Sequence, residues 1–164
     1  MSGGYKNYKY GLTAILVMLA VGVCQASENP QRALEQSNLK KALYCMDLLE
    51  NRPDLEPSHR IDTLRDECFA EAYIQHSPYV QDGRDVVLRL FAKRYKNHPE
   101  TSISIKRTAS EGDLVWIHLH IKRTPEDRGR AVINIFRMKD GKFAEHWNTV
   151  QAVPEKSKNN NTMF

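Results

Sequence analysis

The chain has 164 residues, of which 41% are hydrophobic and 27% charged, and this composition suits one globular domain with one core. The formal net charge is +4, but basic residues alternate with acidic ones, as in Arg84-Asp85 and Glu126-Asp127-Arg128. The sequence has no cationic stripe interleaved with aromatic residues, so we expect no nucleic-acid partner.

The first 26 residues have the order of a secretory signal peptide. Lys6 and Lys9 precede an apolar run over Leu12–Val23, and Cys24-Gln25-Ala26 offers small residues before a cut. The run has 12 residues, whereas a membrane-spanning helix needs about 20, which favours cleavage over a retained anchor. A lipoprotein modified at Cys24 is a further alternative. Cleavage after Ala26 would leave 138 of the 164 residues, lower the net charge from +4 to +2, and place the protein in the periplasm or outside the cell, free of the membrane.

Cleavage would also leave two cysteines, Cys45 and Cys68. In an oxidising compartment they could form a disulfide, but free cysteines are also commonly buried as small apolar residues. The sequence does not decide between these two states, because it does not fix the Cα separation that a disulfide needs.

Helical spacing of apolar residues predicts three helices in the first half of the mature chain. The first covers Pro30–Asn51, and Pro53 and Pro57 then form a linker. The second runs from Ser58, expected as its N-cap, to about Ile74, and the third from Asp82-Gly83 to His98-Pro99.

After residue 101 the apolar residues alternate, which predicts strands. The expected strands are Ser102–Lys106, Leu114–Arg123, Arg130–Lys139 and Lys142–Val153, with Asp140-Gly141 as a two-residue hairpin turn. Helices followed by an antiparallel meander indicate an α+β fold. The expected organisation is a signal peptide (1–26), an N-terminal helix and linker (27–57), the main domain (58–154) and a polar tail (155–164) whose final Met163-Phe164 could dock on the body.

Several motifs in the second half resemble one known family, the SnoaL-like proteins of the nuclear-transport-factor-2-like superfamily. The motifs are Tyr73-Ile74-Gln75-His76-Ser77-Pro78 with Asp82-Gly83, Glu111-Gly112-Asp113-Leu114-Val115 with His118, Ile135-Phe136-Arg137 with Asp140-Gly141-Lys142, and Glu145-His146-Trp147. Each motif is weak by itself, but their order over Tyr73–Phe164 is specific. The resemblance implies a cone-shaped roll in which a curved antiparallel sheet wraps around helices and encloses a pocket. It also implies relatives that include cofactor-independent polyketide cyclases, distant ketosteroid isomerases, ligand-binding proteins and dimerisation modules, so the fold alone does not settle function.

At two positions this chain departs from the family pattern. Relatives usually have a carboxylate where this chain has Asn134, and commonly a second acid where it has Asn148. An asparagine can donate a hydrogen bond to an enolate oxygen, but it cannot accept a proton as a general base. These two residues therefore weaken the family's usual acid–base mechanism.

Strand pairing extrapolated from the Asp140-Gly141 turn places Asn134 opposite Trp147, and Phe136 opposite Glu145. The loop after Arg123 leaves the next register open: either His120 lies beside Asn134 and His118 beside Phe136, or His118 aligns with Ile135 and His146. The first register is preferred because it gathers one polar and aromatic cluster typical of a ligand pocket. On this basis the catalytic candidates are His118, His120 and Glu145, and the ligand-binding candidates are Tyr73, His76, Trp116, Asn134, Phe136 and Trp147.

Each of these residues also has a purely structural interpretation. Glu145 could be an exposed strand residue, the histidines hydrogen-bonded neutral core residues, and the tryptophans ordinary core. A zinc site could use His118, His120 and either His146 or His76, but the preferred register separates His146 from the pair, so no metal and no cofactor are expected.

Three functions remain open on sequence grounds. They are an enzyme of enolate (aldol-type) chemistry on a small carbonyl compound, a non-catalytic binder of a small organic ligand, and a dimerisation module. A homodimer is expected in each case, because one sheet face with Ile133, Ile135, Ala144 and Val150 is too apolar to remain wet.

Overall fold

The computed structural model describes residue 1 and residues 29–164. The predicted signal peptide, the alternative membrane anchor and the Cys24 lipidation site lie outside the described residues. Among the helices that are described, none combines the length and apolar character needed to cross a bilayer.

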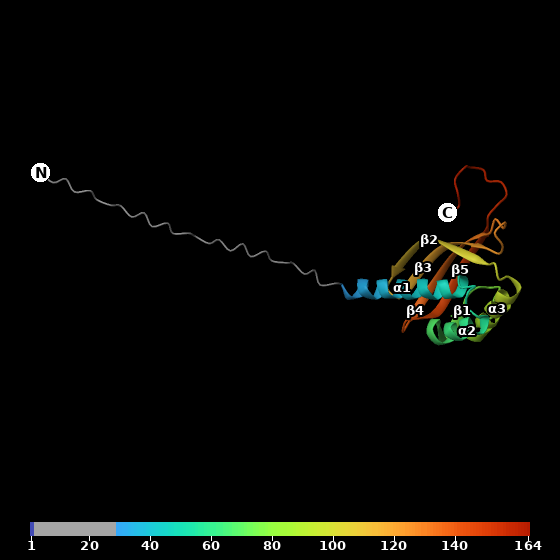
Figure 1. Ribbon diagram of the computed structural model, residues 1–164, viewed down its shortest axis with the longest axis horizontal. Helices are drawn as coiled ribbons and strands as arrows, with labels where there is room; N and C mark the ends of the chain where they lie inside the picture. Colours follow the sequence, from blue (N-terminus) through green and yellow to red (C-terminus); the bar gives the residue numbers. More distant parts are fainter. Residues whose placement is uncertain (2–28) are drawn as a thin grey trace.

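Helix α1 (Pro30–Glu50) matches the first predicted helix. Its N-cap is Asn29, whose side-chain oxygen accepts a hydrogen bond from the Gln31 backbone N–H at 3.0 Å, and Pro30 occupies the first helical position, where its missing N–H costs nothing. Ala42, Cys45 and Met46 are almost fully buried against the sheet. Figure 1 shows α1 lying along one face of the sheet, with α2 and α3 at one end.

The second predicted helix is shorter than expected. Helix α2 (Pro57–Thr63) is capped at Glu56 and not at Ser58, and a π-helical turn (η1, Leu64–Cys68) leads directly into a strand, β1 (Phe69–Gln75). The prediction of helix as far as Ile74 was wrong because the two buried residues of this stretch, Phe69 and Tyr73, are four residues apart, a spacing that both a helix and an alternating strand satisfy.

Cys45 and Cys68 form a disulfide with a Cα–Cα distance of 5.6 Å. The bond joins the buried face of α1 to the end of η1, at the point where the chain changes from helix to strand. Of the two states left open by the sequence, the structure therefore has the disulfide.

Helix α3 (Arg84–Asn97) begins after Gly83, as predicted, and Gly83 has φ of 99°, a conformation that favours glycine. Strands β2 (Ser102–Glu111), β3 (Leu114–Lys122), β4 (Arg130–Lys139) and β5 (Lys142–Ala152) follow. Strand β2 is longer than predicted. Its second half is exposed and mostly polar, so the apolar alternation that predicts a strand is missing there.

The sheet has the order β1-β5-β4-β3-β2, with β1 parallel to β5 and the other neighbours antiparallel. The α+β prediction is thus confirmed, with a mixed sheet in place of a purely antiparallel one. Buried residues of β3, Val115, Ile117 and Leu119, alternate with half-exposed ones, so the sheet has one core face and one outer face.

The β4–β5 register contains a bulge that the sequence did not reveal. Lys139 pairs with Lys142 as predicted, but from Arg137 onwards the pairing shifts by one residue, so that Arg137 opposes Glu145 and Asn134 opposes Asn148. The predicted pairs Asn134–Trp147 and Phe136–Glu145 were therefore wrong. The extra residue in β5 exchanges the faces on which its later side chains lie.

The β3–β4 register also differs from both predicted alternatives. Ile117 lies beside Asn134, and His118 beside Ile133. The seven-residue loop 123–129 sets this register, because the Asp127 carboxylate accepts hydrogen bonds from the backbone N–H groups of Arg123 and Gly129. Gly129 has φ of 76°, and an added Cβ would lie 2.3 Å from the Ile121 carbonyl oxygen, so glycine is required there.

Candidate functional site

The predicted polar and aromatic cluster is divided between the two faces of the sheet. Trp116, His118 and His120 alternate with the buried residues of β3, and they lie on the outer face. Glu145 and Trp147 share that face, because they pair with Arg137 and Ile135 beyond the bulge. Of the predicted site residues, only Tyr73, Asn134 and Phe136 line the main cavity.

On the outer face the predicted catalytic candidates are held by neighbours. Glu145 accepts from Arg137 Nε at 2.7 Å and contacts His76 Nε2 at 2.8 Å, and these hydrogen bonds lower the pKa of its carboxyl. The His76 ring stacks on Trp147 with centroids 4.6 Å apart. This arrangement is an exposed ion-pair network and not an enclosed site.

The two remaining outer-face histidines lie under the end of the chain. His120 Nε2 contacts the Arg128 carbonyl oxygen at 2.7 Å, and Arg107 donates to His118 Nδ1 at 3.2 Å. The Phe164 ring stacks on His120 at 4.3 Å between centroids, so the expected docking of the C-terminal residues is confirmed. His118 and His120 share a face without His146, and no group of three or more potential metal ligands occurs among residues 29–164.

The main cavity lies on the opposite face, between the sheet and the helices. It has a volume of about 210 Å³, which is below the range of about 300–1,000 Å³ common for drug-sized ligands. Most of its walls are apolar. The lining comes from α1 (Met46, Leu49, Glu50), β1 and the loop after it (Phe69, Tyr73, Gln75, Ser77, Val80), α3 (Val87, Leu90, Phe91, Arg94) and the sheet (Leu119, Ile121, Arg130, Val132, Asn134, Phe136, His146, Asn148, Val150).

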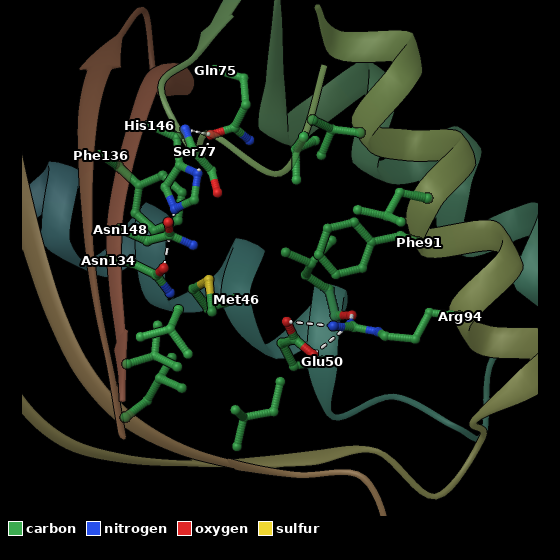
Figure 2. A pocket seen from close by; sticks show the side chains of 18 of the residues that line it. Met46, Glu50, Gln75, Ser77, Phe91, Arg94, Asn134, Phe136, His146 and Asn148 are labelled. Carbon is green, nitrogen blue, oxygen red and sulfur yellow. Dashed lines mark hydrogen bonds and ion pairs between the residues drawn. The ribbon is translucent and has the colours of Figure 1, made fainter. Parts of the chain in front are cut away.

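Two clusters of polar side chains face each other across this cavity. Figure 2 shows Asn134, His146, Asn148 and Gln75 on the sheet wall, and Glu50 with Arg94 on the helix wall. Sequence analysis missed His146 as a cavity residue because the unpredicted bulge turns it inward. It also missed Glu50, which lies four residues after Met46 on the buried stripe of α1 but was not counted there because it is charged.

On the sheet wall, His146 is held by two amide side chains. Its Nδ1 lies 2.9 Å from Gln75 Oε1, and its Nε2 lies 3.0 Å from Asn134 Oδ1. Burial, together with the charge of nearby His76, lowers the pKa of His146 to about 4, so the imidazole is neutral at neutral pH.

A neutral imidazole has one donor and one acceptor, and this fixes the hydrogen bonds around it. Gln75 Oε1 also accepts from the Ser77 backbone N–H at 3.0 Å, so the proton of His146 is on Nδ1 and is donated to that oxygen. Nε2 then needs a donor, and Oδ1 of Asn134 cannot supply one. The two ends of an amide are alike in shape, so we assign the Asn134 amide in the reversed orientation, with its NH₂ group donating to Nε2. Figure 2 draws the nitrogen of Asn134 toward the cavity; in the reversed orientation the end that faces the cavity is the carbonyl oxygen, an acceptor.

On the helix wall, Glu50 and Arg94 form a buried ion pair. Arg94 donates through Nη1 to Oε1 at 3.2 Å and through Nη2 to Oε2 at 2.5 Å. Burial raises the pKa of Glu50, and the Arg94 charge opposes that rise. Arg94 also packs on the Phe91 ring, with its guanidinium carbon 4.1 Å from the ring centroid. Both carboxylate oxygens are therefore occupied.

A curved mixed sheet that closes over helices around one apolar cavity defines the cone-shaped, nuclear-transport-factor-2-like class of α+β protein. Within this class, the chain belongs to the SnoaL-like domain family, which matches residues 54–146, more than half of its length. The resemblance inferred from the motifs is thus confirmed. Among curated proteins, none matches the chain in sequence.

Solved structures of low sequence identity share the fold. A candidate isomerase of the SnoaL-like family from Agrobacterium tumefaciens is 10% identical, with a TM-score of 0.58 over 71% of this chain and 99% of its own. A candidate SnoaL-like polyketide cyclase from Jannaschia sp. CCS1 is 15% identical, with a TM-score of 0.55 over 76% of this chain and 90% of its own. An LEH-like epoxide hydrolase from Mycobacterium tuberculosis is 12% identical, with a TM-score of 0.55 over 72% of this chain and 85% of its own. Proteins named for different reactions therefore share this fold.

Proposed function

We propose that this protein is an exported SnoaL-like protein that binds a small, largely apolar organic molecule in the cavity between sheet and helices. The observation that carries this proposal is the hydrogen bonding of the cavity. Its walls are apolar, its amides are oriented, and its titratable groups His146 and Glu50 are already engaged by Gln75, Asn134 and Arg94. Such a site can hold and orient a ligand without a group free to move protons.

The ligand's polar atoms meet two amides on the sheet wall. Asn134 presents its carbonyl oxygen, which accepts from a ligand hydroxyl or N–H group. Asn148, its neighbour across β4 and β5, also lines the cavity, and its amide can both donate and accept. The cavity volume of about 210 Å³ favours a ligand with one or two small rings or a short chain over a larger polycyclic molecule.

Export is part of this proposal. The signal-peptide pattern of residues 1–26 supports it, and the Cys45–Cys68 disulfide agrees with an oxidising compartment. Folding in the periplasm or outside the cell would give the protein access to small molecules that enter from the surroundings.

Native mass spectrometry of the mature protein, purified from its own compartment without denaturation, tests the binding proposal. We expect a stoichiometric additional mass of a few hundred daltons or less, lost when His146 is replaced by Phe, whose ring fills the site without polar atoms. A matched control is His98→Phe at the exposed end of α3, which should retain the added mass. Purified protein that carries no such mass, and takes up none from an extract of its own compartment, contradicts the proposal.

Enolate chemistry on a small carbonyl compound is the second candidate, and the neutral state of His146 favours it. With a pKa of about 4, His146 has the basicity of a carboxylate, the group that the relatives place where this chain has Asn134, and it is unprotonated at neutral pH. For His146 to accept a proton, Asn134 would have to leave Nε2 and a substrate C–H take its place, while the Asn148 NH₂ donates to the enolate oxygen.

Hydrogen–deuterium exchange distinguishes catalysis from binding without knowledge of the product. An enolising site would exchange the α-hydrogens of small cyclic ketones in D₂O, which proton NMR follows directly. We expect exchange in the wild type and none in His146→Phe if this second candidate is correct. Equal rates in both proteins and in buffer would leave binding as the function.

A further inference from the structure

A second cavity adjoins the ligand cavity and is rich in arginine. It has a volume of about 170 Å³ and shares Arg94, Ile121 and Arg130 with the main cavity as lining residues. Arg123, Asp127 and Thr101 complete it. We call Arg94, Arg123 and Arg130 the arginine mouth.

The charges around the arginine mouth do not balance. Three guanidinium groups meet two carboxylates, those of Glu50 and Asp127, and the positive charge of Arg60 also acts on Glu50. The Asp127 carboxylate is held by backbone N–H groups, which lower its pKa. Among the ion pairs of the described residues, neither the Arg123 nor the Arg130 guanidinium has a carboxylate within 4.0 Å.

Hydrogen-bond donors at the mouth are also left over. Arg94 Nε and Thr101 Oγ1 are buried without a hydrogen-bond partner in the described part of the chain. Buried polar atoms are nearly always paired, so these two atoms, on residues that line the same cavity, call for an additional partner, either a water molecule or a ligand atom. Guanidinium and hydroxyl groups together suit a planar carboxylate, which accepts several hydrogen bonds at once.

We propose that the ligand is a small organic carboxylate, whose apolar body fills the main cavity and whose carboxylate is bound at the arginine mouth by Arg130, Arg123 and the free donors of Arg94 and Thr101. This inference rests on the proposed function, because it assumes that the main cavity binds a small molecule. It adds the chemical class of the ligand and its direction: carboxylate toward the loop 123–129, and the uncharged polar end toward Asn134 and Asn148.

Matched acids and amides test the proposal, because each pair differs in charge while the body is the same. The probes are benzoate with benzamide, cyclohexanecarboxylate with cyclohexanecarboxamide, and hexanoate with hexanamide, each titrated into the mature protein at low ionic strength and followed by heteronuclear NMR. We expect at least one acid to bind at least about tenfold more tightly than its amide, equivalent to about 1.4 kcal/mol. Its shift changes should include the backbone amides of residues 130 and 134.

The variants assign this preference to the mouth. Arg123→Gln/Arg130→Gln should reduce the acid-to-amide preference to less than about threefold, and Arg130→Lys, which keeps the charge but loses the planar fork, should give an intermediate value. Arg89→Gln, the same change on the exposed side of α3, should leave the preference unchanged. Arg123 and Arg130 are exposed, so the double variant should fold, and its NMR spectrum reports this directly.

The outcomes separate the two proposals. Acids and amides that bind equally, or a preference that survives in the double variant, overturn the carboxylate site and leave the small-molecule cavity in place. Probes that all fail to bind, in a protein that also carries no ligand from its own compartment, overturn both.

Discussion

Replacing Arg94 with Met should destabilise the protein strongly, because it leaves the Glu50 carboxylate buried without its partner. Glu50 is only 8% exposed, and both of its oxygens accept hydrogen bonds from Arg94. Removing one member of a buried ion pair costs about 3–5 kcal/mol. For a domain of this size, that corresponds to a fall in the melting temperature of about 10–20 °C.

The loss of stability in Arg94→Met should also depend on pH. Burial raises the pKa of Glu50 above its ordinary value of 4.5, and without Arg94 that pKa rises further. A carboxyl with a raised pKa in the folded state favours folding while it is protonated. That contribution is complete below the unfolded pKa and is lost as the pH rises through the folded pKa. The difference in free energy of unfolding between wild type and Arg94→Met should therefore be larger at about pH 8 than at about pH 5.

Urea denaturation followed by tryptophan fluorescence measures this at both pH values, with two matched variants. Glu50→Gln/Arg94→Met removes the buried charge, so it should recover a large part of the stability lost in the single variant. Arg137→Met breaks the exposed pairs with Asp113 and Glu145, and it should cost much less stability because solvent screens these pairs. An Arg94→Met variant that loses no more stability than Arg137→Met, or loses the same amount at both pH values, would refute the reasoning.

Four further outcomes are expected. Asn134→Asp should raise the pKa of His146 above about 4 in an NMR titration, because a carboxylate beside Nε2 stabilises the imidazolium; an unchanged pKa would contradict the contact. Cys45→Ala/Cys68→Ala should lower the free energy of unfolding by about 3 kcal/mol in urea titrations, since the bond closes a loop between residues 23 positions apart; a loss below about 1 kcal/mol would show that the bond constrains little. Light scattering should give a dimer that Ile133→Glu converts to a monomer, because Ile133 is 46% exposed on the outer face; a wild-type monomer would refute the dimer. The intact mass of the exported protein should equal that of a chain beginning at Ser27, and a mass that includes residues 1–26 or a lipid on Cys24 would exclude the proposed cleavage.

Features that depend on short-range patterns were predictable from the sequence. Helix α1, the start of α3 after Gly83 and the Asp140-Gly141 hairpin follow from periodicity, capping and turn chemistry, each of which acts within a few residues. The order of the motifs was enough to give the family and, through it, the cavity between sheet and helices.

The composition of the cavity was not predictable, because it depends on strand register. The bulge after Arg137 leaves no signal in residue types, and it moves His146 and Asn148 to the core face and Glu145 and Trp147 to the outer face. The same error placed Val150 on the outer face with Ile133, whereas Val150 pairs with Val132 and lines the cavity. Asn134 was placed correctly in the cavity, but its predicted role as donor was replaced by that of acceptor once His146 was its neighbour.

The Cys45–Cys68 bond has a consequence for how the cavity can open. It fixes α1, which carries Met46 and Glu50, to the residue that directly precedes β1, which carries Phe69 and Tyr73. The disulfide therefore restrains the separation of these two walls, whereas no disulfide joins α3 or the loop 123–129 to them among the described residues. If the cavity binds a ligand as proposed, we expect the opening that admits it to lie on the side of α3 and this loop, so that oxidation of one pair of thiols would set the route of entry.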